Sequence, residues 1–339
     1  MSAAVEARTR RGLNEPAPPQ PQPGGTARGA GQGAGPGPKR QGKRFGAIIE
    51  KYGAYLFIGP AVIYLLIFTV YPLISGIMLS FTATKLVNPD GGRPVGLDNY
   101  SYLVSSDKFW NSVGTTLLYT GFTVLFAVAL GTIAAIALNT PFFGRPIIRA
   151  IATIPWAIPT VAAALIFVWM YNNELGILGR GTQALGLGQP GWLIDPKLGL
   201  LAVTIATVWK VFPLVMLVML ASLQSVPHEL KEATWMDGAN PWQSFRAVTL
   251  PHVMPTVRVL ALLMTIWSIR RFEIIFLITG GGPLDATNTL VVNVYRTAFQ
   301  DQNLGRAAAI GVLGLVLSLM VTLVYFLVER HQEKREDNR

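Results

Sequence analysis

The sequence predicts an all-α membrane protein that crosses the bilayer with six transmembrane helices. Charged side chains make up only 14% of the 339 residues and apolar ones 51%, whereas an average soluble domain carries about 25% charged residues. The mean hydropathy is +0.42. Six apolar segments follow Lys51, each longer than the ~20 residues that cross a ~30 Å hydrocarbon core. They cover residues 54–81, 113–138, 147–171, 198–223, 253–278 and 307–328.

The chain begins with a basic, polar tail. Residues 14–38 contain 14 Gly or Pro among 25 positions, and no aliphatic or aromatic side chain larger than Ala. Such a stretch cannot bury enough apolar surface to offset its chain entropy, so we expect residues 1–44 to form a disordered cytoplasmic tail. The membrane domain then covers residues 45–330, and residues 331–339 form a second charged cytoplasmic tail.

The formal net charge of +10 indicates membrane orientation rather than a nucleic-acid partner. Residues 1–51 hold nine Lys and Arg against three acidic residues, and the rest of the chain has no basic stripe interleaved with aromatic residues, as nucleic-acid grooves have. With the N-terminus inside, the cytoplasmic segments carry 18 Lys and Arg and the opposite side carries 7. Because positive residues concentrate on the cytoplasmic side, we expect both termini there.

Prolines interrupt several of these spans. Those in or at the ends of spans are Pro60, Pro72, Pro155, Pro159, Pro213 and Pro255. Membrane helices tolerate proline because neighbouring helices re-satisfy the freed backbone groups. We therefore expect kinked helices.

The segment 225–255, between the fourth and fifth spans, is too polar to cross the bilayer and predicts two short amphipathic helices. Ser225 and Pro227 suit a helix start, and Gly238 suits a left-handed stop. A second start follows at Asn240, and apolar residues recur at helical spacing in both halves. Two interpretations fit this pattern: an interfacial helix resting on lipid headgroups, or a docking element for a soluble partner.

This loop resembles the coupling segment of a known family. The spacing EAA, three residues, Gly, nine residues, Ile, one residue, Leu-Pro marks the permease subunits of binding-protein-dependent ABC importers. The residues in that register are Glu232, Ala233, Thr234, Gly238, Val248, Leu250 and Pro251. Residues 277–290 are similar to the TxGGP segment of maltose-permease-like and glycerol-phosphate-permease-like first subunits, and residues 54–82 resemble the family's first span.

The resemblance implies the type I ABC importer permease fold in a bacterial cytoplasmic (inner) membrane. Such a permease pairs with a second permease subunit, two cytoplasmic ATPase subunits and an extracytoplasmic solute-binding protein, and moves a sugar or polyol, or a sugar or glycerol phosphate, by alternating access. In the family the EAA helix docks on the ATPase. The residues that this implies for the contact are Glu229, Leu230, Glu232, Ala233, Met236, Asp237 and Gly238. The outer loops 82–112, 172–197 and 280–306 would receive the binding protein.

Four charged residues lie inside the predicted spans and away from their cytoplasmic ends, where charges usually face a bundle interior or a watery cavity. Lys210 lies near the centre of the fourth span, and Arg270, Arg271 and Glu273 lie toward the outer end of the fifth. Three interpretations are open: an ion pair with Glu273 that only holds helices together, a place near the outer gate, and direct contact with the solute. Because aromatic walls and a few polar groups suit sugars, the residues expected along the solute path are Trp209, Lys210, Thr265, Trp267, Ser268, Arg270, Arg271 and Glu273.

Other function classes find little support in the sequence. The three histidines lack metal-ligand spacing, no credible ATP site is present, and the chain has no cysteine. We therefore expect no catalytic residue, metal or cofactor, and we assign ATP hydrolysis to a separate subunit. The rival hypothesis is a secondary transporter that uses the intramembrane Lys, Arg and Glu residues for ion coupling. Dependence of uptake on ATP rather than on a proton gradient would distinguish the two.

Overall fold

The computed structural model describes residues 55, 57–186 and 188–336. The predicted tail 1–44 lies outside these residues, as do the last three residues of the predicted C-terminal tail. The chain divides into two compact units, Met1–Val62 and Ile63–Arg339. All contacts, cavities and sites discussed below lie within the second unit.

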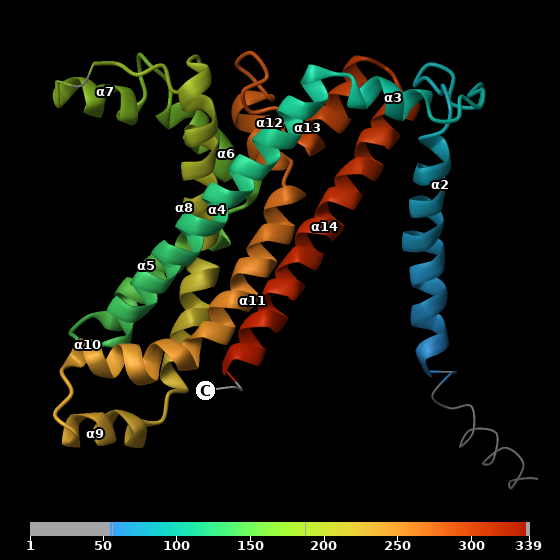
Figure 1. Ribbon diagram of the computed structural model, residues 1–339. Coiled ribbons are helices and arrows are strands. Elements are labelled where there is room, and N and C mark those ends of the chain that lie inside the picture. The colour runs from blue at the N-terminus through green and yellow to red at the C-terminus, as the bar shows by residue number, and fades with distance from the viewer. Residues whose placement is uncertain (1–54, 56, 187, 337–339) are drawn as a thin grey trace, which may run out of the picture. The chain divides into compact units, whose positions relative to one another are not determined.

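The described residues are mainly helical, and the β-structure among them amounts to isolated bridges. Figure 1 shows the arrangement of the helices. The α-helices are α2 (Tyr71–Leu79), α3 (Asp98–Val104), α4 (Asp107–Asn139), α5 (Arg145–Ala157), α6 (Thr160–Met170), α7 (Ile177–Ala184), α8 (Pro196–Gln224), α9 (His228–Met236), α10 (Pro241–Ser244), α11 (Leu250–Ile269), α12 (Glu273–Thr279), α13 (Leu290–Tyr295) and α14 (Leu304–Glu336). Single π-helical turns occur at η1 (Leu66–Val70), η2 (Phe245–Thr249) and η3 (Arg296–Gln300).

Five helical stretches of the described chain are long and apolar enough to cross a membrane. They are Phe57–Leu79, Asp107–Asn139, Pro196–Gln224, Pro241–Ile269 and Leu304–Arg330. A sixth span is formed if α5 and α6 are counted together as one broken helix. The predicted helical membrane protein is thus confirmed, with differences in the third and fifth spans.

The third predicted span, residues 147–171, is not one kinked helix. Its two halves, α5 and α6, are bent by 96° at a short break. Pro155 lies inside α5, and Ile158 is extended directly before Pro159, which precedes α6. A residue before proline is pushed away from the helical region, and proline itself lacks an amide hydrogen, so two prolines four residues apart convert the expected kink into a break.

The fifth predicted span, residues 253–278, is displaced in the structure. The helix begins earlier, at Pro241, and passes through the π turn η2 into α11. This turn lies just before Pro251, which lacks the amide hydrogen that a regular helical ladder would use at this point. The helix ends at Ile269, and α12 begins separately after the linker 270–272.

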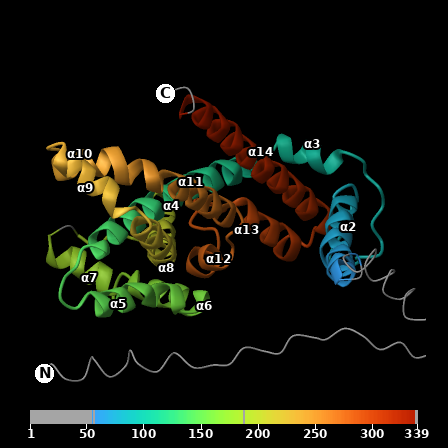
Figure 2. The ribbon, with the colours of Figure 1, turned by 90° about the horizontal axis from the view of Figure 1, so that it is seen from below.

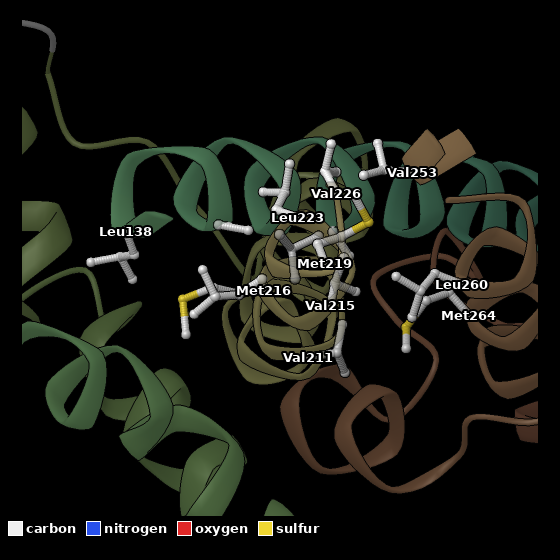
Figure 3. Close-up of a cluster of buried hydrophobic side chains, with 14 residues drawn as sticks. Leu138, Val211, Val215, Met216, Met219, Leu223, Val226, Val253, Leu260 and Met264 are labelled. Carbon is white, nitrogen blue, oxygen red and sulfur yellow. The ribbon is translucent and has the colours of Figure 1, made fainter. Parts of the chain in front are cut away.

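The helices α4, α8 and α11 form the packed centre of the second unit. α4 and α8 make the most extensive helix pair, α11 packs against both, and α5 and α6 flank α8 (Figure 2). Figure 3 shows the apolar cluster between them, in which Val215, Met216 and Met219 of α8 lie among side chains from α4 and α11.

Polar contacts also join these helices. Tyr119 of α4 and Thr207 of α8 share a hydrogen bond of 2.8 Å between their hydroxyl groups. Thr116 accepts a hydrogen bond from the backbone amide of Leu290, at the start of α13, over 2.8 Å. Because lipid supplies no hydrophobic driving force between helices, buried hydroxyl bonds of this kind and close packing hold a membrane bundle together.

Candidate functional site

A cavity of about 690 Å³ lies where two helices are interrupted, between α5 and α6 and after the end of α11. Its lining residues are Trp156, Thr160, Lys210, Val211, Trp267, Arg270, Arg271, Phe272 and Glu273. The cavity therefore combines an aromatic wall with three basic side chains and one acidic one. Its volume falls within the range of about 300–1,000 Å³ that is usual for small-molecule sites.

Trp156 and Trp267 form the aromatic wall. Their rings stack with centroids 6.1 Å apart and planes inclined by 11°. Trp156 is held by the last turn of α5 and Trp267 by the last turn of α11, and both side chains remain about one-third exposed. Such a wall suits a flat solute face that carries apolar C–H groups, as a pyranose does.

Lys210 enters the cavity from the middle of α8 and is only 6% exposed. Its ammonium group donates to the backbone carbonyls of Pro155 (3.1 Å), Trp156 (3.0 Å) and Ile158. These carbonyls end α5, where the helix dipole favours a positive charge. The ammonium also lies 5.8 Å from the centre of the Trp156 ring.

Arg270, Arg271 and Glu273 lie around the break between α11 and α12. No salt bridge joins Glu273 to Lys210, Arg270 or Arg271, all of which the structure describes, so the helix-joining ion pair with Glu273 does not form. The Nε atom of Arg271 is buried without a hydrogen-bond partner.

A second candidate surface is formed by α9 and α10, which cross one end of α8 and α11 in Figure 1. All seven residues expected at the ATPase contact are exposed, with Met236 at 88%. Trp235, which the sequence pattern did not single out, is 60% exposed beside them. Since α9 buries none of its own residues in this chain, its apolar side chains are available to a partner.

Local bonds brace this pair of helices. Gly238 has φ of +79°, the left-handed conformation that glycine adopts without steric cost. Thr234, which replaces the second Ala of the EAA pattern, donates to the hydroxyl of Ser244 over 2.7 Å and so links α9 to α10. Asn240 and Gln243 form a capping box at the start of α10. The hairpin is therefore held by its own sequence before any partner binds.

Both surfaces lie within a region that matches a known protein family. Residues 127–334 match the family described as "Binding-protein-dependent transport system inner membrane component". The chain belongs to this family. The resemblance found in segment 225–255 is thus confirmed, and the chain is a permease of the inner membrane.

This permease has curated relatives along most of its length. It is 36% identical to the trehalose/maltose transport system permease protein MalF of Thermococcus litoralis, over 81% of this chain and 93% of the relative. It is 32% identical to the sulfoquinovosyl glycerol transport system permease protein SmoG of Agrobacterium fabrum, over 83% of this chain and 91% of the relative.

A solved structure shares the fold. The permease superimposes on a chain of a bacterial ABC transporter involved in the import of the acidic polysaccharide alginate, with a TM-score of 0.74 at 23% identity. The likeness covers 85% of this chain and 99% of the other. The predicted type I importer permease fold is therefore confirmed.

The permease brings together five of the residues expected along the solute path, and separates three. Lys210, Trp267, Arg270, Arg271 and Glu273 line the cavity. Trp209 instead packs edge-to-face against Phe167 at 5.3 Å between ring centroids. Thr265 donates to the carbonyl of Ala261 within its own helix, and Ser268 is buried outside the lining.

Trp156, Thr160 and Phe272 line the cavity but were missing from the expected solute path. The signal that points to Trp156 and Thr160 is the pair Pro155 and Pro159, since a break at these prolines turns the adjacent side chains toward the bundle. Among the described residues, no three His, Asp or Glu side chains gather to hold a metal ion.

Proposed function

We propose that this permease carries a carbohydrate or polyol derivative across the inner membrane and that the cavity at the two helix breaks is part of the path. The stacked pair Trp156 and Trp267, set beside charged groups in a cavity of about 690 Å³, is the observation that carries the proposal. The relatives named for trehalose/maltose and sulfoquinovosyl glycerol support this solute class. The basic lining also accommodates an anionic derivative.

The energy for transport comes from ATP hydrolysis in separate subunits that dock on α9 and α10. This part of the proposal rests on the exposed apolar side chains of Leu230, Trp235 and Met236. An interfacial role on lipid suits the surface less well, because Glu229 and Glu232 would face anionic headgroups. A second permease subunit completes the path.

The binding protein docks at the opposite end of the helices, on the predicted outer loops. In the loop after α12, Asp285 forms a salt bridge with Arg296. The side-chain amide of Asn111, on α4, donates to the Asp285 carbonyl over 2.9 Å. These bonds give the loop a defined shape and leave Leu284 91% exposed at its tip, as a docking loop requires.

Family membership favours this importer over a secondary transporter. The two differ in energy source, so uptake into vesicles should require internal ATP and should survive collapse of the proton gradient. Loss of uptake when the gradient alone is removed would favour ion coupling. The ligand of the co-purified binding protein would name the solute.

Replacing Trp156 or Trp267 by Ala tests the cavity. We expect solute uptake per assembled complex to fall at least about tenfold in each variant, because removing one ring takes away the wall for the solute face. The measurement is uptake into vesicles that contain the complete complex, at saturating binding protein. The amount of complex, determined in the same vesicles, should stay unchanged.

Trp169→Ala is the matched control. Trp169 lies on α6 of the same broken span, is 60% exposed and does not line the cavity. Uptake in this variant should remain close to that of the wild type. Wild-type uptake in both cavity variants would remove the cavity from the solute path.

A further inference from the structure

The break between α5 and α6 leaves carbonyl groups that the helix itself cannot satisfy. In a continuous helix the carbonyl of Pro155 would accept from the amide of residue 159. That residue is proline, which has no amide hydrogen. Because water is absent from the bilayer core, an unpaired carbonyl at this depth requires a partner from elsewhere in the protein.

Lys210 supplies that partner and uses its full hydrogen-bonding capacity to do so. An ammonium group has three N–H donors and no acceptor. The Lys210 ammonium meets three carbonyls, those of Pro155 and Trp156 in the last turn of α5 and that of Ile158, which caps this helix directly before the break. No donor is left for a solute.

We propose that Lys210 is a positioning residue that holds the end of α5 at the break and thereby presents Trp156 to the cavity, while Arg271, which is half-buried, is the cation that meets the solute. Lys210 donates to the backbone carbonyl of Trp156, and its ammonium lies beside the Trp156 ring. That ring stacks on Trp267. Arg271 lines the same cavity with a side chain that is only half-buried, so its guanidinium is open to a solute there. The role of Arg271 and the effect of Lys210 on uptake rest on the proposed function. The role of Lys210 in holding the end of α5 does not.

The structural part is tested by a distance across the break, without solute. The chain contains no cysteine, so within this subunit spin labels attach only at introduced sites. Ile151 on α5 and Leu165 on α6 are exposed and suit Ile151→Cys and Leu165→Cys. In the assembled complex, Lys210→Met should shift and broaden the label-to-label distance distribution, because the carbonyls lose their partner.

Thr207→Val is the matched control for this measurement. Thr207 lies one turn from Lys210 on α8 and is fully buried, but it bonds to Tyr119 of α4 rather than to the break. The control should keep the wild-type distribution. An unchanged distribution in Lys210→Met would overturn the positioning role.

A double-mutant cycle on uptake separates positioning from solute contact. Lys210→Met alone should lower the uptake rate per complex about three- to tenfold, the worth of one aromatic contact. In the Trp156→Ala background it should cause little further loss, because the residue through which it acts is gone. Multiplicative losses would show that Lys210 acts on uptake independently of Trp156 and would overturn the positioning role.

Arg271→Gln should lower uptake in both the wild-type and the Trp156→Ala background, as expected for an independent solute contact. Unchanged uptake would overturn its assigned role. If Lys210→Met does not assemble, Lys210→Gln keeps two donors and should give a smaller shift in the same distance. If Trp156→Ala and Trp267→Ala both transport normally, the proposed path fails while the distance measurement still decides the role of Lys210.

Discussion

At the scale of single residues, the contact between α4 and α8 depends on a position without a side chain. A Cβ atom at Gly131 would lie 2.6 Å from the side chain of Val215 and 3.0 Å from the backbone nitrogen of Met216. Real Cβ atoms do not approach other atoms so closely, so either helix would have to move. Small residues at such crossings let membrane helices pack backbone to backbone.

Gly131→Ala should therefore destabilise the permease by about 1–3 kcal/mol, the usual cost of overpacking a core. The check is the thermal unfolding midpoint of the detergent-solubilised complex, which should fall. Gly121→Ala is the control on the same helix, because a Cβ there meets nothing within 4 Å. Its midpoint should match or slightly exceed that of the wild type, since Ala favours helices. Equal midpoints in both variants would contradict this account of the α4–α8 contact.

Single residues also mark the limit of what the sequence predicts. A lysine in the middle of an apolar span indicates a buried charge with a purpose, and Lys210 is indeed buried beside a cavity. From residue types alone, the partner expected for this buried charge is the carboxylate of Glu273. The actual partners are backbone carbonyls, which every residue possesses and which no sequence pattern distinguishes.

At the scale of elements, the hairpin of α9 and α10 follows from its local sequence. Gly238 supplies the left-handed turn, and Asn240 with Gln243 caps the next helix. A Cβ at Gly238 would meet nothing within 4 Å in this chain. A side chain at this position therefore has room until a partner approaches.

Gly238→Asp and Glu232→Lys should abolish ATP-driven uptake without preventing membrane insertion, if this surface docks on the ATPase. The measurements are uptake, ATPase stimulation and the amount of permease in the membrane. Gly144→Asp is the control for backbone strain, because Gly144 also has positive φ and open space around it. Uptake in Gly144→Asp should persist. Wild-type transport in both hairpin variants would remove the docking assignment.

At the scale of the whole molecule, the two broken helices lie side by side around one cavity. The break at Pro155–Pro159 and the linker 270–272 both contribute lining residues. The break at Pro155–Pro159 leaves backbone carbonyls within a predicted span, and the linker 270–272 carries two arginines there. Such groups are tolerated inside a membrane only where they are buried in protein or line a cavity.

The orientation of the molecule follows from its charge distribution, which predicts cytoplasmic termini. Because the chain lacks cysteine, single introduced cysteines report their own side of the membrane. Leu284→Cys, in an exposed outer loop, should react with an impermeant maleimide added to intact cells. Phe143→Cys, at the exposed turn between α4 and α5, should react only after permeabilisation. The reverse labelling pattern would invert the topology.

The sequence by itself determined most of the apolar spans and the α9–α10 hairpin, because hydropathy and helix caps are local properties of the chain. It did not determine the break in the third span or the displacement of the fifth. Residue composition located the apolar spans, and the register from Glu232 to Pro251 identified the family. Only the tertiary structure decided that Trp156 stacks on Trp267 and that Lys210 binds the end of α5. Such contacts join residues far apart in the chain. They depend on the direction that each helix takes after its break and on which backbone carbonyls are then left without a hydrogen-bond donor.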